Sequence, residues 1–487
     1  MGTTAGQGEV PVAGEVPTDL KRVMGPRLLL LFIVGDILGT GVYALTGEVA
    51  AQVGGAAWVP FLVAFVIATI TAFSYLELVT KYPEAAGAAL YAHKAFGLHF
   101  VTFIVAFTVM CSGITSASTA SRAFASNVAT GFGLDSTDPT LGLCIALGFM
   151  ALVAVVNIRG VGESVKANIV LTGVELSGLL LVILVGFYAL FAGRTDFSRT
   201  IVFDSPGDKN AFLAVTAATS LAFFAMIGFE DSVNMAEETK DPVRIFPTMM
   251  LSGLAITGGI YVLVALFAVA IVPVGELARG DTPLVTVVET AAPGVPISTL
   301  LPFISMFAVA NSALINMLMA SRLLYGMARQ GVLPSFLGTV HRGRRTPWAA
   351  ILFTTALAAG LIVVVSENAG GEVISALGGT TALLLLGVFT LVNVCVLVLR
   401  RDRIDRDHFT SPGVLPAVGA LLCAFFVGPW TGRDGIQYRI AGWLLVVGVA
   451  LWALTWLVDR AVHGTGTSRR TPDERDEPPG LGGGAAG

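Results

Sequence analysis

The sequence predicts an all-α integral membrane protein with twelve transmembrane helices. Of the 487 residues, 55% are hydrophobic and only 13% are charged, with a mean hydropathy of +0.80. Soluble domains carry about 25% charged residues. The chain contains a series of apolar segments of about 20 residues each, which is the length that crosses a bilayer as a helix. Two of these segments are interrupted at their centres by glycine and acidic residues, which a plain membrane helix does not need.

Taken in chain order, the apolar segments give the predicted spans. They are 27–51, 57–80, 98–130, 140–158, 166–192, 211–235, 248–273, 295–327, 347–366, 372–399, 412–430 and 439–459. Segment 98–130 is long and is predicted to tilt strongly. Segments 81–97 and 282–292 do not read as spans, and we expect short helices there, on opposite faces of the membrane. The polar ends, 1–20 and 463–487, are predicted to be disordered, so the membrane domain is 21–462.

The charges of the loops orient the predicted spans. An even number of spans puts both ends of the chain on one side of the membrane. The loops and ends of that side carry 22 Lys and Arg residues, whereas the opposite side carries six. Positive residues gather on the cytoplasmic side. We therefore expect both termini in the cytoplasm, with the protein in the cell membrane.

The first span is the more unusual of the two interrupted ones. Its centre, Val34–Tyr43, holds three glycines and Asp36. A glycine inside a helix costs about 1 kcal/mol relative to alanine, and an acid at the centre of a membrane helix costs about 2.5–3.5 kcal/mol. The simplest explanation is a helix that breaks at Gly39–Gly41 and turns its free backbone groups towards a cavity.

The sixth span repeats this feature near Gly228. Because the two interrupted spans lie five helices apart, they suggest two repeats of five helices, at 27–192 and 211–399. Span one starts inside and span six starts outside, so the repeats would be inverted relative to each other. Two helices at 412–459 would lie outside the repeats.

A broken helix supplies two kinds of free backbone group. The N–H groups that begin a half-helix carry partial positive charge, and the C=O groups that end one carry partial negative charge. Together they suit the carboxylate and ammonium of an α-amino acid. An alternative is that the glycines only allow close helix packing. The predicted substrate-binding residues are Gly39, Thr40 and Gly41 for the carboxylate, and Ile37, Phe224, Ala225, Ile227 and Gly228 on the carbonyl side.

These motifs resemble the amino acid–polyamine–organocation (APC) superfamily. The resemblance covers about 21–406 and rests on Gly39–Gly41, Phe223–Glu230, Ala236–Pro242, Tyr82–Tyr91 and Ser321–Gly331. It is strongest to the prokaryotic relatives of cationic amino acid transporters. It implies the LeuT-type five-plus-five fold and a permease, not an enzyme, that moves amino acids by alternating access. The composition, rich in Arg, Ala, Val and Gly, hints at a bacterial source.

The chain departs from those relatives at two acids. Alignment on Gly162–Ser164 places Glu175 where many relatives carry a lysine, and Asp36 replaces a small apolar residue. The two acids could couple transport to H⁺. They could instead bind a cation together with Asn311 and Ser312, or bind a basic substrate directly. The structural alternative is an ion pair with Arg122, the one arginine inside a span.

Other residues have weaker predictions. Glu77 is expected to form a structural hydrogen bond to a neighbouring helix. Glu230, with Asp231, is either a helix cap or a substrate contact, and with Phe223 and Phe229 it is a candidate gate.

The sequence offers no nucleotide-binding loop, metal cluster or catalytic triad, so we expect no cofactor and no nucleic-acid partner. The expected partners are the lipid bilayer, a coupling ion, H⁺ first, and a small-molecule substrate. Rival hypotheses are a polyamine transporter or an amino-acid exchanger of the same fold, and, from another class, a channel or receptor.

Overall fold

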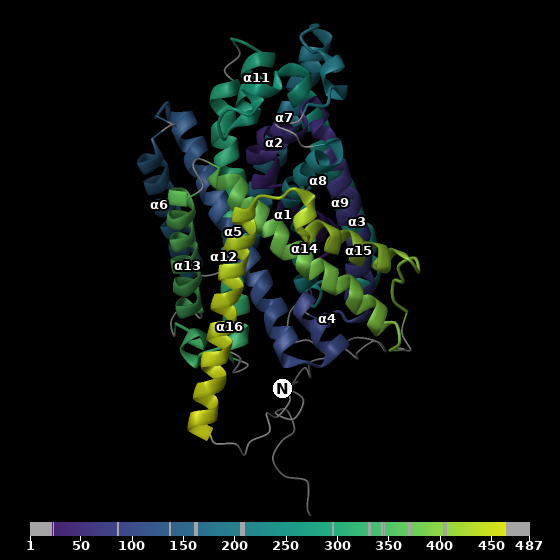
Figure 1. Ribbon diagram of the computed structural model, residues 1–487, viewed down its shortest axis with the longest axis vertical. Coiled ribbons are helices and arrows are strands. Elements are labelled where there is room, and N and C mark those ends of the chain that lie inside the picture. Colours follow the sequence, from purple (N-terminus) through teal and green to yellow (C-terminus); the bar gives the residue numbers. More distant parts are fainter. Residues whose placement is uncertain are drawn as a thin grey trace, which may run out of the picture.

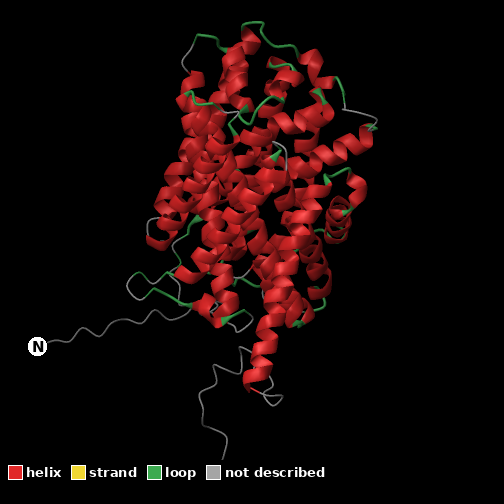
Figure 2. Ribbon diagram, turned by 60° about the vertical axis from the view of Figure 1, so that its left-hand side comes forward, coloured by secondary structure: helices red, strands yellow, loops and turns green. Residues whose placement is uncertain are grey.

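The computed structural model describes residues 22, 24–84, 87–135, 138–159, 164–204, 210–294, 297–329, 333–341, 344, 346–368, 372–402 and 407–463. The predicted disordered ends lie outside these residues, apart from His463, as do Gly162 and Glu163 of the alignment above. This part of the chain folds into helices, with two isolated β-bridges and no strand (Figure 2). The α-helices are α1 Pro26–Ile37, α2 Thr40–Val53, α3 Trp58–Lys81, α4 Gly87–Phe96, α5 His99–Phe132, α6 Pro139–Arg159, α7 Ser164–Phe191, α8 Ala211–Ala222, α9 Pro242–Ile271, α10 Val274–Leu277, α11 Pro283–Ala291, α12 Ile297–Arg329, α13 Trp348–Asn368, α14 Val373–Leu399, α15 Leu415–Val427 and α16 Gly435–His463.

Eleven helical segments of the described chain are long and apolar enough to cross a membrane. They correspond to eleven of the twelve predicted spans. The exception is the predicted span 412–430, where α15 has only 13 residues. Proline disfavours helical geometry in the residue before it, and Gly428–Pro429 follows the last residue of α15 directly. The prediction of an all-helical, multi-pass membrane protein is confirmed, whereas the count of twelve spans is not.

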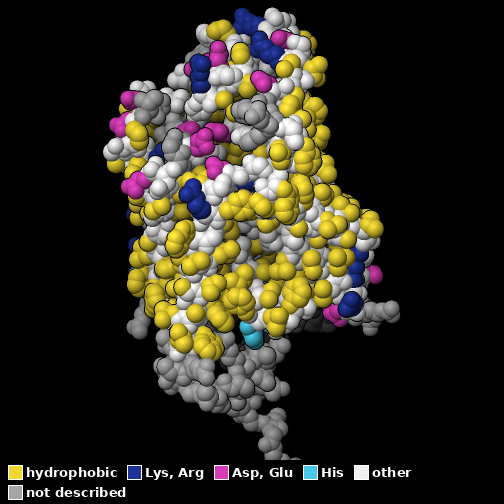
Figure 3. Space-filling view, viewed as in Figure 1, with side chains coloured by type: hydrophobic (Ala, Val, Ile, Leu, Met, Phe, Trp, Pro, Cys, Tyr) yellow, Lys and Arg dark blue, Asp and Glu magenta, His cyan; other side chains and the backbone are white. Residues whose placement is uncertain are grey.

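The surface of the molecule agrees with a membrane protein. On the face drawn in Figure 3, hydrophobic side chains form a broad band across the middle and lower part of the molecule, and charged side chains gather mostly at the upper end. Large apolar side chains are exposed along the outer helices, such as Trp443 of α16 at 71% and Leu152 of α6 at 57%. Lipid tails, rather than water, are the solvent that such a surface fits.

Two short helices lie at opposite ends of the molecule, as the sequence predicts. Helix α4 lies at the lower end in Figure 1 and α11 at the upper end. Their positions confirm that segments 81–97 and 282–292 do not cross the membrane. Helix α11 packs against α7, α12 and α2, so it covers the upper end of the first broken span.

The two interrupted spans lie at the centre of the bundle. Of the most apolar 18 residues in each span, 72% are buried in Pro26–Val53 and 78% in Ala211–Met235. The corresponding share in Gly435–Leu457 of α16 is 28%. Helices α5, α12 and α14 pack side by side around this centre, and α9 packs on both α1 and α3. The glycines and acids of the sequence motifs are therefore inside the protein and do not face lipid.

A buried ion pair joins α3 to the loop after α14, which confirms the hydrogen-bonding role predicted for Glu77. The Glu77 carboxylate accepts two hydrogen bonds from Arg400, each 2.8 Å long. It also accepts the amide and hydroxyl hydrogens of Ser411, at 2.9 and 2.7 Å. The Glu77 side chain is 3% exposed and that of Arg400 is 25% exposed.

Replacing Arg400 with alanine is expected to destabilise the fold. The change leaves the Glu77 carboxylate buried without its cation, a loss of about 3–5 kcal/mol in comparable sites. The measurement is the melting temperature of the detergent-purified protein, which we expect to fall for Arg400→Ala and to stay unchanged for Arg401→Ala, its exposed neighbour. Equal melting temperatures for the two variants would mean that the pair contributes nothing to stability.

Candidate functional site

The first broken span interrupts its helix where the sequence predicts. Helix α1 ends at Ile37, Leu38 and Gly39 are extended, and α2 begins at Thr40. No side chain caps the start of α2, so the first N–H groups of that helix are not used by a capping residue. This end of α2 carries partial positive charge and can receive an anionic group.

The second broken span is interrupted over a longer stretch. Helix α8 continues as a short 3₁₀ turn, Phe223–Met226, and the chain is then extended at Ile227. Gly228 follows with φ of +124°, a conformation that favours glycine. A second 3₁₀ turn, Asp231–Met235, begins the other half of the span.

The two breaks touch each other through glycines. A Cβ atom added to Gly41 would lie 2.5 Å from the Cα atom of Ala225. A Cβ atom added to Gly228 would lie 2.6 Å from the carbonyl oxygen of Asp36. These glycines therefore serve close packing, the alternative weighed above, and at the same time they bring both sets of backbone ends to one place.

A small cavity of about 30 Å³ lies where the breaks meet. Of the eight predicted substrate-binding residues, seven line it, and the exception is Ala225, which packs against Gly41. The volume suits about one or two water molecules. The lining residues are Asp36, Ile37, Gly39, Thr40, Gly41, Ser116, Phe224, Ile227, Gly228, Asp231, Ser312 and Asn316.

A tyrosine of α9 occupies part of the first break. The Tyr261 hydroxyl donates a hydrogen bond of 2.6 Å to the carbonyl oxygen of Ile37. It thus ties α9 to the end of α1. One lone pair of the Ile37 carbonyl is therefore already used, whereas the amides of Thr40 and Gly41 at the beginning of α2 are candidates for a carboxylate.

Sequence reasoning missed two residues that line the cavity, Ser116 of α5 and Asn316 of α12, which pack beside the breaks. Asp231, weighed above with Glu230 as a helix cap or a substrate contact, lines the cavity as well. Ser and Asn inside apolar helices were the available signal. The hydroxyl of Thr40, a predicted residue, is buried and has no hydrogen-bond partner.

The two unusual acids lie close to this cavity without a partner. Asp36 lines the cavity, and its Oδ2 atom is buried with no hydrogen bond. Glu175 of α7 is 0% exposed, and neither of its carboxyl oxygens has a partner. The two carboxyls repel each other electrostatically. Burying one unpaired carboxylate costs several kcal/mol, so this pair needs a proton or a cation.

The structural alternative for these acids, an ion pair with Arg122, is wrong. Arg122 lies on α5 beside Gly142 of α6, and its charge interacts with Asp281. Its Nη1 atom has no hydrogen-bond partner. Within the described chain, neither Asp36 nor Glu175 forms an ion pair.

The remaining predicted ion ligands lie on α12. Ser312 lines the cavity, and its hydroxyl oxygen would lie 2.5 Å from a Cβ atom on Gly39. Asn311 is 2% exposed, and its Nδ2 atom has no partner. Both residues therefore lie on the helix that faces the first break.

The three predicted gate residues have different surroundings. The Glu230 carboxylate accepts, at 2.8 Å, the amide hydrogen of Gly228, which lies before the turn Asp231–Met235, and it makes no cap hydrogen bond to that turn. The rings of Phe223 and Phe229 pack against Phe389 of α14, with centroids 6.0 and 5.4 Å apart. Neither ring lines the cavity, whereas Phe224 does. These contacts favour a packing role for Phe223 and Phe229.

The fold and the cavity define a multi-pass membrane protein with a central site for a small molecule. The chain belongs to the amino acid permease family, whose sequence model matches residues 27–452. The match covers most of the chain, including both broken spans. Members of this family and the relatives below are permeases and transporters, so the chain is a transport protein and not an enzyme.

Curated relatives span nearly the whole chain. The branched-chain amino acid permease BcaP of Bacillus subtilis is 25% identical, over 90% of this chain and 92% of its own length. The methylthioribose transporter of the same organism is 26% identical, over 88% and 92%. The vacuolar cationic amino acid transporter 4 of Arabidopsis thaliana is 30% identical, over 90% and 77%. The names of these relatives differ in substrate, so they support transport of amino acids or similar small molecules.

Proposed function

We propose that the chain is a secondary active transporter that moves amino acids across the cytoplasmic membrane by alternating access. The observation that carries this proposal is the cavity where two broken spans meet, because it offers free N–H groups and free C=O groups within one small space. An α-amino acid carries a negative carboxylate and a positive ammonium group, so it can use both kinds of backbone group. In this proposal, the substrate reaches the cavity through a cycle in which the site opens to one side of the membrane at a time.

The proposed architecture is the LeuT-type inverted repeat. Repeat one would be 27–192 and repeat two 211–399, with α15 and α16 as the eleventh and twelfth helices in 412–459. The support is the spacing of the two breaks, α1–α2 and α8–η4, where η4 is the 3₁₀ turn Asp231–Met235. A broken span opens each proposed repeat.

The proposed coupling ion is H⁺, carried by Glu175 with Asp36. The support is that Glu175 is buried with neither carboxyl oxygen hydrogen-bonded, and that Asp36, at the end of α1, has a buried Oδ2 atom without a hydrogen bond. Proton binding would remove the unpaired charge and so favour one conformation of the transporter over another. A metal cation held by the same acids with Asn311 and Ser312 is the second candidate, because both residues lie on α12 and Ser312 lines the cavity beside Gly39.

The test is uptake by proteoliposomes that contain the purified protein. Labelled amino acids and polyamines are offered with an inward proton gradient, an inward sodium gradient or neither. We expect amino acids to accumulate with the proton gradient alone. If only the sodium gradient drives accumulation, the coupling ion is sodium and not the proton. If polyamines are taken up and no amino acid is, the proposed substrate class is wrong.

The proposed orientation places both ends of the chain in the cytoplasm. We expect a C-terminal tag on the protein to resist protease in intact cells and to be cut after the cells are permeabilised. The reason is the ratio of 22 to six positive residues between the two predicted sides. A tag that is cut in intact cells would reverse this orientation.

A further inference from the structure

The loop between α12 and α13 carries an unbalanced positive charge. Between Glu289 and Glu367 the sequence has no Asp or Glu, whereas it has five arginines, four of them within 329–345. Arg329 and Arg344, the two of these four that the structure describes, are exposed, and neither forms an ion pair with another described residue. An anionic partner would therefore meet cations on this loop without a competing carboxylate.

This loop is fixed against the end of α6. The Thr346 hydroxyl donates a hydrogen bond of 3.1 Å to the carbonyl oxygen of Ile158, and the Thr346 carbonyl accepts the amide hydrogen of His341 at 2.9 Å. Arg159, the last residue of α6, follows Ile158 directly, is exposed and has no ion pair among the described residues. Arg344 lies two residues before Thr346. Two cations from different elements thus flank one contact.

The acidic residues nearest to α6 in the sequence lie outside the helix. The segment 139–162 contains no Asp or Glu. The next acid, Glu163, lies outside the described residues. Helix α6 therefore adds the charge of Arg159 to that of the loop and contributes no carboxylate of its own.

Exposed apolar stripes of α6 and α13 lead to these cations. Leu152 and Val155 are exposed and lie seven and four residues before Arg159, on the same face of α6. On α13, Trp348 and Leu352 are exposed and lie four residues apart, so they share a face as well. The two helices pack side by side and form the left edge of the molecule in Figure 1. Tryptophan is typical of the level at which a membrane meets water.

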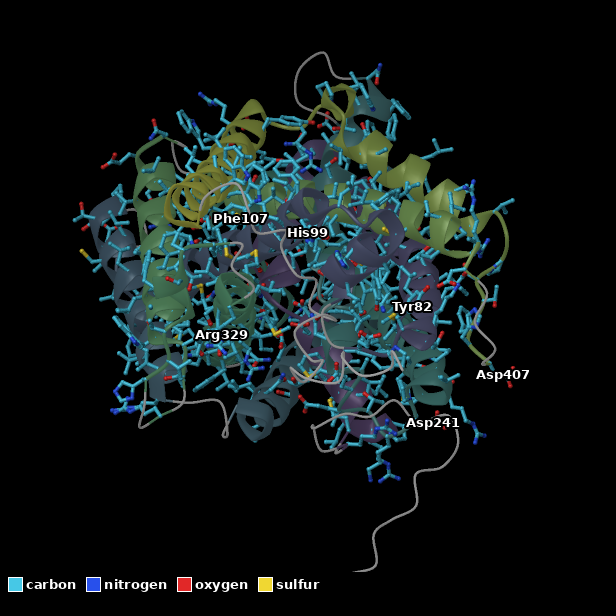
Figure 4. All side chains as sticks on the ribbon, turned by 90° about the horizontal axis from the view of Figure 1, so that it is seen from below. Tyr82, His99, Phe107, Asp241, Arg329 and Asp407 are labelled. Carbon is cyan, nitrogen blue, oxygen red and sulfur yellow. The ribbon has the colours of Figure 1, made fainter. Side chains whose placement is uncertain are left out.

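The loop itself exposes large apolar side chains beside its cations. Phe336 is 61% exposed and belongs to the 3₁₀ turn Ser335–Gly338, which packs on α12 and α13. A Cβ atom on Gly338 would lie 3.5 Å from the Cδ atom of Arg329, so the stem of Arg329 lies against this turn. In Figure 4, seen from below, Arg329 lies left of the centre, on the side where Figure 1 places α6 and α13. A soluble anion would use only the cations, whereas a lipid can cover the apolar side chains too.

We propose that this surface binds an anionic phospholipid of the leaflet at the lower end in Figure 1, which is the cytoplasmic leaflet in the orientation proposed above. The phosphate would lie between Arg159 and Arg344, with Arg329 as a further cation, and the acyl chains would follow the exposed stripes of α6 and α13. A guanidinium group can donate two hydrogen bonds to one phosphate. Basic sites between membrane helices on the cytoplasmic side suit such head groups. The lipid would bind outside the central cavity, so it is not a transported substrate.

The first experiment measures binding of lipid to the wild-type protein in detergent. The melting temperature is recorded with phosphatidylglycerol, with phosphatidylcholine of the same acyl chains, and with inorganic phosphate at equal concentrations. We expect phosphatidylglycerol to raise it most, and added salt to weaken this effect by screening. Equal stabilisation by phosphatidylcholine would mean that the apolar stripes alone bind lipid. Equal stabilisation by phosphate would mean that a free anion occupies the surface. Either result, or no effect of phosphatidylglycerol, would overturn the proposal.

The second experiment tests the two arginines that flank the contact. In the double variant Arg159→Gln and Arg344→Gln, we expect the apparent affinity for phosphatidylglycerol to fall by about fivefold for each arginine removed. The matched control is the double variant Arg244→Gln and Arg401→Gln, which removes two exposed arginines at the start of α9 and after α14 and should keep the wild-type affinity. All four side chains are exposed, so the melting temperatures without lipid should agree. An unchanged affinity in the first variant, or an equal loss in both, would contradict the assignment.

Discussion

Uptake by the Gly41→Val variant is expected to fall to the background of empty liposomes. A Cβ atom on residue 41 would lie 2.5 Å from the Cα atom of Ala225 and 2.7 Å from its Cβ atom. The Ala225 Cα atom is backbone, so it cannot move aside without reshaping the second break. Valine adds two methyl groups at the place where the amides of α2 meet the cavity. Both the site and the contact between the broken spans would be lost.

The measurement is initial uptake rate in proteoliposomes, normalised to the amount of inserted protein. Gly387→Val is the matched control, because a Cβ atom on Gly387 of α14 has no neighbour within 4 Å. We expect this control to transport like the wild type. Gly41→Ala makes the milder test, since its Cβ atom alone already meets Ala225. Wild-type kinetics in both Gly41 variants would remove the site from the first break.

The breaks were predictable because their residues are out of place in a plain membrane helix. Glycines and an acid at the centre of an apolar run are costly, and the structure interrupts the helix at Leu38–Gly39 and again at Ile227–Gly228. The sequence could not indicate how the breaks fit together. The contact of Gly41 with Ala225 depends on the relative position of two spans that are almost 200 residues apart.

The residues that sequence reasoning missed act through tertiary contacts. Tyr261 lies in a long apolar run of α9, where a tyrosine is compatible with packing or with the membrane interface. Its hydroxyl instead donates a hydrogen bond to the carbonyl oxygen of Ile37, at the first break. Phe223 and Phe229 were candidate gates because they flank the second break, but the side of the helix that each ring occupies depends on its irregular backbone. Both rings pack against Phe389 of α14.

The count of twelve spans is not confirmed at α15, and the reason is local. The apolar composition of 412–430 hides two points where the helix cannot continue, Pro412–Gly413 before it and Gly428–Pro429 after it. The mean hydropathy of a segment depends on its composition and does not reveal where a helix must begin or end. The resulting helix has 13 residues, whereas about 20 are needed to cross the bilayer core upright.

Glu175→Gln is expected to abolish accumulation driven by a proton gradient while exchange continues. Glutamine has nearly the shape of a protonated glutamate and cannot release a proton. The groups around Glu175 do not supply a compensating cation. Tyr43 donates its hydroxyl to the backbone carbonyl of Glu175, not to the carboxylate, at 2.9 Å, and Asp36 adds a like charge. In the proposed cycle of the wild type, an acidic outer side would load the proton and a more alkaline interior would release it.

Two assays separate the steps of this cycle. Counterflow, in which unlabelled substrate inside drives labelled substrate in, needs no net proton movement, so we expect it to persist in Glu175→Gln. Concentrative uptake under an inward proton gradient needs the proton to bind and leave, so it should be lost. Glu289→Gln, an exposed glutamate of α11, provides the control that keeps both activities. If Glu175→Gln concentrates substrate like the wild type, Glu175 is not the coupling residue. If sodium alone drives uptake, the unpaired acids hold a metal cation and the site includes Asn311 and Ser312, because a coupling ion must bind one conformation more tightly than the other.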